Sequence, residues 1–192
     1  MMILLTKSLG GLASRWRNFY YGCLGVRLDG YVWMRQIEIP RNYADIWLEA
    51  SCALDRGVTL IAGGEPFEKA KIEIASHTYI NRNTIIDAID LVRIGRDCAI
   101  GPNCYITDHD HGLDSRFAPL QQPMIARKTI IGDRVWLGAN VTVLKGVQIG
   151  HDAVIGAGSV VTKNIPEQAI AVGIPAKVVR VKNNFHSHTP IS

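Results

Sequence analysis

Two histidines alternate with two aspartates in the segment ITDHDHG at residues 106–112, where the surrounding chain is mostly aliphatic. His109 and His111 are candidates for proton transfer, because an imidazole with an ordinary pKa near 6.5 is largely neutral at pH 7 and can take a proton from a hydroxyl group. A positioned base of this kind contributes about 10² to 10⁴ in rate. The alternative is that these polar residues only cap a turn.

The histidines lie where a regular sequence pattern breaks off. The next segment, GLDSRFAPLQQPMIARKT, is polar and interrupted by proline, and the pattern returns at Ile131. We therefore expect a protruding loop over residues 112–130. Loops held by a rigid scaffold often carry function, so this position favours a functional role for the histidines.

A period of six residues indicates what the scaffold is. From Ile131 the chain contains six consecutive units that begin with an aliphatic residue: IGDRVW, LGANVT, VLKGVQ, IGHDAV, IGAGSV and VTKNIP. Further units, the last three less regular, begin at Ile74, Ile80, Ile94, Ile100, Ile106, Ile46, Cys52 and Val58. Six is a poor helical period but a multiple of the strand period of two, so the aliphatic residues share one face. The sequence predicts an all-β solenoid of short parallel strands joined by tight turns.

The small residues of each unit have separate expected roles. Gly, Asn and Asp that follow the aliphatic residue supply turns with positive φ. The fifth position holds compact residues that fit inside a corner: Val135, Val141, Ala153, Ser159, Cys98 and Cys104. The four cysteines, which also include Cys23 and Cys52, form no CxxC pair, and we expect buried thiols.

Composition and charge fit one domain with an aliphatic core. Only 7% of the 192 residues are aromatic, so Ile, Val, Leu and Ala must build that core. No segment has the apolar length of a membrane helix or the features of a secretory signal, which predicts a cytoplasmic protein. The net charge of +4 is uneven: residues 131–182 carry six bases and three acids. This excess fits an anionic ligand or a solvated surface, and we expect no nucleic-acid partner.

The two ends differ from the solenoid. Residues 1–24 are expected to form an amphipathic helix, interrupted at Gly10 and Gly11, with an apolar stripe of Leu5, Leu9, Leu12, Trp16, Phe19 and Cys23. This stripe would pack against the solenoid or a neighbouring subunit; weak contact with a membrane surface is the alternative. Residues 25–182 would form the solenoid domain, and residues 183–192 a mobile C-terminal tail.

The repeats over residues 46–180 resemble those of the hexapeptide-repeat acyltransferases, in the branch of galactoside, maltose and polysaccharide O-acetyltransferases. The resemblance implies a left-handed parallel β-helix of triangular section. It also implies an acetyl-CoA-dependent O-acetyltransferase that modifies a carbohydrate hydroxyl in surface polysaccharide biosynthesis, by direct transfer without a covalent enzyme intermediate.

The resemblance also assigns the base. Alignment anchored at Ile94 and Gly95 places the histidine base of the family on His111, with His109 as the second candidate. It places acceptor contacts at Asn81, Tyr79 and Asp108. The sequence departs from galactoside acetyltransferase at one acceptor position. Where that enzyme has an aspartate that helps to hold the sugar, this chain has Ile89, and Asp87 and Asp90 lie only nearby.

The cosubstrate side carries more matching residues. In IGDRVWLGAN, Trp136 corresponds to a tryptophan that lines the pantetheine groove, and the N–H of Ala139 to one that faces the thioester oxygen. Further contacts to coenzyme A fall on Ala157, Thr162, Lys163, Lys177 and Arg180. The family is trimeric with sites between subunits, so His111 of one chain would work with Trp136 and Ala139 of the next.

Three other functions remain open from the sequence. Relatives of this kind also acetylate an amine on a nucleotide-linked amino sugar. Carbonic anhydrases with this fold bind zinc through three histidines, but His109 and His111 lack the HxxxxH spacing, so no metal is expected. A non-catalytic β-helix that acts as a scaffold is the third alternative.

Overall fold

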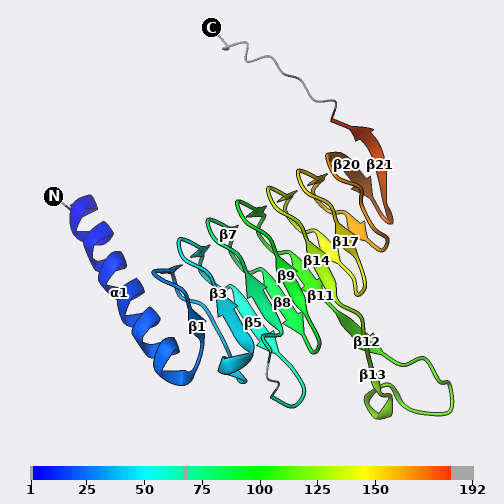
Figure 1. The fold of residues 1–192 in the computed structure, drawn as a ribbon, viewed down its shortest axis with the longest axis horizontal. Coiled ribbons are helices and arrows are strands. Elements are labelled where there is room, and N and C mark those ends of the chain that lie inside the picture. Colours follow the sequence, from blue (N-terminus) through cyan, green and yellow to red (C-terminus); the bar gives the residue numbers. More distant parts are fainter. Residues whose placement is uncertain (1, 67–68, 183–192) are drawn as a thin grey trace, which may run out of the picture.

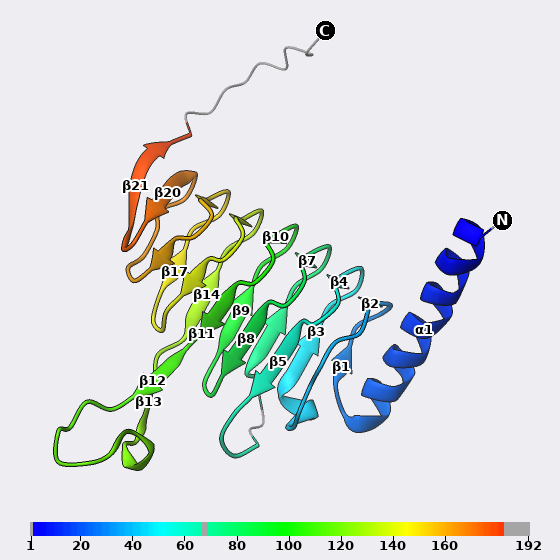
Figure 2. The same ribbon diagram turned by 180° about the vertical axis from the view of Figure 1, so that it is seen from behind.

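The chain winds into a three-sided parallel β-helix with a helix at one end and a hairpin that projects from one side (Figures 1 and 2). The computed structural model describes residues 2–66 and 69–182, with the side chains of residues 2–9 left out. The expected tail at residues 183–192 lies outside the described residues. The N-terminal helix α1 (Met2–Leu24) lies across the first coil, and the last two strands close the opposite end.

Three sheets form the sides of the prism. Sheet A contains, in spatial order, β1 (Arg27–Leu28), β3 (Ile46–Leu48), β6 (Ile72–Ile74), β9 (Val92–Ile94), β14 (Thr129–Ile131) and β17 (Gln148–Ile149). Sheet B contains β2 (Trp33–Met34), β4 (Ala53–Leu54), β7 (Tyr79–Ile80), β10 (Ala99–Ile100), β15 (Trp136–Leu137), β18 (Val154–Ile155), β20 (Ala169–Gly173) and β21 (Ala176–Val181). Sheet C contains β5 (Thr59–Ala62), β8 (Ile85–Ala88), β11 (Tyr105–Thr107), β16 (Thr142–Val143) and β19 (Val160–Val161).

The aliphatic residue of each repeat lies in register with that of the next coil. In sheet A, Ile74 pairs with Ile94, Ile94 with Ile131, and Ile131 with Ile149. All four side chains are at most 2% exposed. Each buried aliphatic side chain contributes about 1.5 to 3 kcal/mol, so the repeat stabilises the prism coil by coil.

The corners confirm the predicted positive φ at Asn and Asp but not at the glycine that directly follows the aliphatic residue. Positive φ occurs at the fourth position of a unit, as at Asn140 (φ 57) and Asp152 (φ 61), and not at the glycine in the second position. That glycine is needed for close approach between coils: a Cβ on Gly101 would lie 2.6 Å from the carbonyl carbon of Gly138. The compact residues at the fifth position are buried as predicted.

Three of the four cysteines follow the prediction. Cys52, Cys98 and Cys104 are buried free thiols, and burial raises the pKa of Cys98 to about 11. Cys23 is also free but exposed, so the prediction was wrong there. It lies on the side of α1 that faces away from the prism, because the opposite side docks on the first coil.

Helix α1 differs from the prediction in two ways: in its continuity and in the side that contacts the solenoid. It continues through Gly10 and Gly11 without a break. The Ser14 hydroxyl accepts the N–H of Met34 at 2.9 Å, and the Asn18 amide bonds both the N–H (3.0 Å) and the C=O (2.7 Å) of Val32. The first coil has an open sheet edge with unpaired backbone groups, so a polar helix face satisfies it best.

The predicted apolar stripe therefore does not pack against the solenoid. Leu12, Trp16 and Phe19 are 60%, 65% and 63% exposed. The side chains of Leu5 and Leu9 lie outside the described residues. Within the part of the chain that the structure describes, no helix has the length and apolar character needed to cross a membrane.

The protruding segment begins earlier than expected. It is a hairpin of β12 (His109–His111) and β13 (Met124–Ala126), with the short 3₁₀ helix η2 (Pro119–Gln121) between them. A second 3₁₀ helix, η1 (Tyr43–Asp45), precedes β3. The regular coil resumes at Thr129, so the histidines belong to the projecting hairpin itself.

Candidate active site

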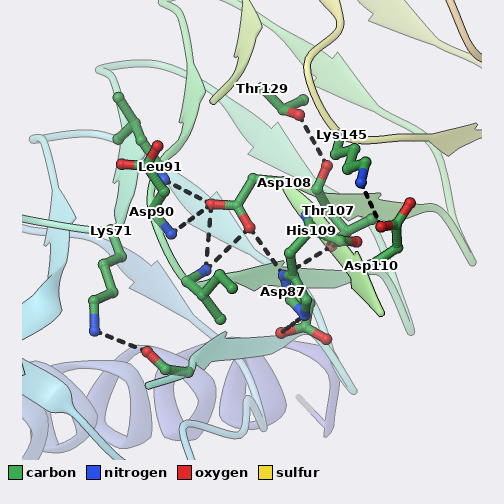
Figure 3. A network of polar contacts seen from close by, with 12 residues as sticks. Lys71, Asp87, Asp90, Leu91, Thr107, Asp108, His109, Asp110, Thr129 and Lys145 are labelled. Carbon is green, nitrogen blue, oxygen red and sulfur yellow. Dashed lines mark hydrogen bonds and ion pairs between the residues drawn. The ribbon is translucent and has the colours of Figure 1, made fainter. Parts of the chain in front are cut away.

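Asp108 lies at the root of the hairpin in a cradle of backbone N–H groups (Figure 3). At this corner from sheet C to sheet A, Ile94 follows Ile86 at a spacing of eight positions instead of the six of a regular repeat. This surplus turns the N–H groups of residues 89–91 toward the Asp108 carboxylate, at 3.0, 2.7 and 2.6 Å. Burial alone would raise the pKa of this carboxyl, but hydrogen bonds from His109 and the three N–H groups lower it overall.

His109 is held between two carboxylates. Its Nδ1 lies 2.9 Å from Asp108 Oδ1 and 3.2 Å from the Thr107 hydroxyl, and its Nε2 lies 4.0 Å from Asp87 Oδ1. The hydrogen bond with Asp108 raises the pKa of His109 against the opposing effect of burial. Its side chain is only 10% exposed. The contacts with Asp108 and Thr107 thus fix the ring of His109 in place, which suits a structural clamp.

His111 has different surroundings. It lies two residues further along β12, so its side chain leaves the strand on the same side as that of His109. Its Nδ1 is buried and has no hydrogen-bond partner. Among the described residues, no carboxylate lies within ion-pair distance of its ring. Its other ring nitrogen, Nε2, is not among the buried atoms and has no partner in the described chain, so it is the nitrogen available for a further partner.

Three side chains near the histidines, those of Lys145, Asp110 and Tyr105, were not predicted as site residues. Lys145 forms an ion pair with Asp110 and donates to the carbonyl of Ile125 at 3.3 Å, which ties the hairpin to the prism. The Tyr105 hydroxyl donates to Asp87 at 3.2 Å. No signal along the repeat pointed to Lys145, because its partner Asp110 lies in the hairpin, beyond the register that pairs Ile106 with Val143.

The predicted cosubstrate residues lie elsewhere, mainly along sheet B. Trp136 is 57% exposed on the outer face of β15. The register runs from Trp136 to Val154, then to Ile170 and finally to Arg180. Trp136 and Arg180 thus occupy one row across four strands, or roughly 14 Å at the usual strand spacing.

Ala139 and Ala157 present free N–H groups at the corner that follows sheet B. At the equivalent position of earlier coils, the N–H of Arg82 bonds the side chain of Asn81 (2.7 Å), as that of Arg56 bonds Asp55. The residue before each alanine is glycine, which has no side-chain oxygen to accept a hydrogen bond from the alanine N–H. Within the described chain, neither alanine N–H has an acceptor, so each is open to water or a ligand.

The other predicted residues divide between these regions. Tyr79 lies on sheet B and donates its hydroxyl to Asp55 at 3.0 Å, and Asn81 follows it at the corner. The remaining cosubstrate candidates are exposed near the C-terminal end and have no ion-pair partner among the described residues: Thr162, Lys163, Lys177 and Arg180. Asp108, predicted to touch the acceptor, is fully buried with its carboxylate engaged by backbone N–H groups and by His109, and its contact with an acceptor stays a prediction.

One chain does not bring His111, the predicted base, and the Ala139 N–H together. His111 projects from the corner between sheets C and A, whereas Ala139 lies at the corner between sheets B and C. The whole width of sheet C separates them. Among the described residues, no cluster of His, Cys, Asp and Glu is arranged to hold a metal ion.

Comparison with known proteins identifies the family. The bacterial transferase hexapeptide (six repeats) model matches residues 128–163, and the hexapeptide repeat of succinyl-transferase matches residues 91–112. Over 88% of its length the chain is 35% identical to the Escherichia coli (strain K12) protein "Putative lipopolysaccharide biosynthesis O-acetyl transferase WbbJ", of which the alignment covers 84%. The chain belongs to the hexapeptide-repeat acyltransferase family.

Solved structures agree with this placement. Galactoside acetyltransferase in complex with coenzyme A is 30% identical, with 72% of each chain covered and a TM-score of 0.58. AntD, an N-acyltransferase from Bacillus cereus, has a TM-score of 0.73 over 86% of this chain and 88% of its own, but at 17% identity it shows the fold alone. The prism is the left-handed parallel β-helix of the hexapeptide-repeat acyltransferases, and the chain is an acetyltransferase.

Proposed function

We propose that this hexapeptide-repeat acyltransferase transfers an acetyl group from acetyl-CoA to a hydroxyl of a carbohydrate, in surface polysaccharide biosynthesis in the cytoplasm. The observation that carries the proposal is the free N–H of Ala139, beside the exposed ring of Trp136. Such a donor suits the oxygen of a thioester carbonyl as it gains charge. The likeness to WbbJ supports a polysaccharide acceptor and an ester product.

Acetyl-CoA would lie along sheet B. Its pantetheine arm packs on Trp136, and the N–H groups of Ala139 and Ala157 meet its polar atoms. The row from Trp136 to Arg180 leads to the unpaired cations at the C-terminal end. These cations pair with the phosphates of coenzyme A. Thr162, Lys163 and Lys177 complete the cosubstrate contacts.

His111 acts as the general base in this proposal. Its Nε2, the ring nitrogen that is not buried, takes the proton of the acceptor hydroxyl while the hydroxyl oxygen forms a bond to the thioester carbon. The N–H of Ala139 stabilises the resulting oxyanion. When the C–S bond breaks, the proton passes from His111 to the leaving thiolate, so no covalent enzyme intermediate forms. Asp108, together with His109, holds the hairpin in place and does not touch the reacting atoms.

The separation of His111 from Ala139 within one chain supports a homotrimer with sites between subunits. In that assembly, the hairpin of one chain reaches the sheet B corner of its neighbour. Tyr79 and Asn81, on the same sheet as Trp136, are the proposed acceptor contacts. Neither role needs a metal ion.

The test is product analysis with the purified chain, acetyl-CoA and a panel of sugars and amino sugars. We expect an O-acetyl ester that is cleaved by mild alkali, and loss of its formation in His111→Ala. An alkali-stable amide would instead show that the acceptor is an amine. If the intact protein acetylates no acceptor and shows no hydrolysis of acetyl-CoA, a scaffold role replaces the proposal.

A further inference from the structure

The outer stripe of α1, defined as Leu12, Trp16, Phe19 and Cys23, faces away from the rest of the chain. Three of these side chains are at least 60% exposed, and the rings of Trp16 and Phe19 lie 5.7 Å apart. Both ribbon views show α1 as the outermost element at its end of the prism, with no described segment beyond it (Figures 1 and 2). The stripe is therefore an apolar surface that a flat partner can reach.

The same helix is entirely basic in its charged residues. It carries Lys7, Arg15 and Arg17, and the first acidic residue of the chain is Asp29. Arg15 is exposed beside the stripe. An apolar face of Leu, Trp and Phe with flanking Arg and no acid is the composition of helices that lie in the headgroup region of anionic membranes. Tyr20, 49% exposed, adds a second amphipathic ring next to the stripe.

We propose that the outer stripe of α1 docks the protein on a membrane surface that contains anionic lipids. The apolar side chains enter the interface between headgroups and acyl chains, and Arg15 meets lipid phosphate. The polar contacts of Ser14 and Asn18 hold the helix on the first coil while its other side binds lipid. This inference does not depend on the acceptor or on the base assigned above.

Charge argues against a second copy of this chain as the occupant. Two such helices packed stripe to stripe would bring their exposed Arg15 side chains together, and neither helix carries an acid to offset them. Like charges across an interface oppose association. An anionic lipid surface supplies the opposite charge to Arg15.

The experiment is flotation of the full-length protein with vesicles of phosphatidylcholine alone or mixed with phosphatidylglycerol. We expect binding to the mixed vesicles at least tenfold stronger than to phosphatidylcholine, and weaker binding at high salt. The double variant Trp16→Ser with Phe19→Ser should lose at least tenfold in binding. Leu113→Ser, which removes a 96% exposed leucine from the hairpin loop, is the matched control and should bind like wild type.

Two further readouts keep the test decisive. Fluorescence should shift to the blue when wild type meets the mixed vesicles, and Trp16→Phe should bind while losing most of that shift. Failure of wild type to bind either vesicle would overturn the proposal. A lower oligomeric mass of the double variant on gel filtration, with vesicle binding intact, would show instead that the stripe joins copies of the chain.

Discussion

Asp108 and His109 are neighbours in sequence whose side chains form a hydrogen bond with each other, with Asp108 Oδ1 2.9 Å from His109 Nδ1. The carboxylate also receives three backbone N–H groups from the coil below (Figure 3). The pair therefore fixes the direction in which β12 leaves the prism. His111, two residues later, owes its position to this anchor.

The first prediction separates the two histidines. His111→Ala should lower kcat by about 10² to 10⁴, because the base that removes the hydroxyl proton is lost. His109→Gln should lower kcat less than His111→Ala does, since the glutamine amide can still donate to Asp108. The measurement is kcat at saturating acetyl-CoA for both variants. If His109→Gln lowered kcat more than His111→Ala did, the base would be His109.

The second prediction concerns the cradle. Asp108→Ala should lower the free energy of unfolding by about 3 to 5 kcal/mol, because it leaves three N–H groups and the His109 ring without their acceptor. Asp108→Asn should cost less, as its amide oxygen can still accept. Urea denaturation at a fixed chain concentration measures both. If both variants lowered the free energy of unfolding by the same small amount, the proposed stabilisation by the Asp108 carboxylate would be contradicted.

The third prediction is a pH dependence of stability. The pKa of His109 is raised in the folded chain, so its contribution is complete below its unfolded pKa of about 6.5 and is lost as pH rises through the folded pKa. The pKa of Asp108 is lowered, so its contribution is complete above its unfolded pKa of about 3.9 and is lost as pH falls through the folded pKa. The difference in unfolding free energy between wild type and His109→Gln should therefore shrink from pH 6 to pH 9. A difference that grows over this range would reverse the assigned sign.

The fourth prediction tests the N–H of Ala139. Ala139→Pro removes only this donor, and Pro102 occupies the equivalent position one coil earlier, so the fold should accept the change. We expect kcat to fall by about 10² to 10³ with little change in thermal stability. Ala139→Ser keeps the N–H and should remain active. An active, folded Ala139→Pro variant would rule out this oxyanion contact.

The fifth prediction concerns the assembly. His111→Ala and Ala139→Pro are each expected to be inactive, but refolding them together should restore about a quarter of the wild-type activity if each site combines one chain's histidine with another's N–H. Mixed assemblies with no recovered activity would place both groups of a site in one chain. Refolded wild type serves as the control for yield.

The sequence by itself determined the coil. The six-residue rhythm puts each Ile or Val on the inner side, so a solenoid of short parallel strands follows from the local pattern, whereas its triangular section and left hand followed only from the family resemblance. The motif at residues 106–112 and the residues around Trp136 were also visible without coordinates, because they interrupt or accompany that rhythm.

Only the tertiary structure decided what those residues face. The partner of Asp108 is a set of N–H groups created by a two-residue surplus in another coil, and Lys145 reaches Asp110 across 35 positions. Helix α1 turned its polar side inward because the first coil offers open backbone groups, which no periodicity along the helix can reveal. A repeat specifies which side chains share a face. The residues that those side chains contact depend on how separate coils stack, and the stacking forms only when the whole chain folds.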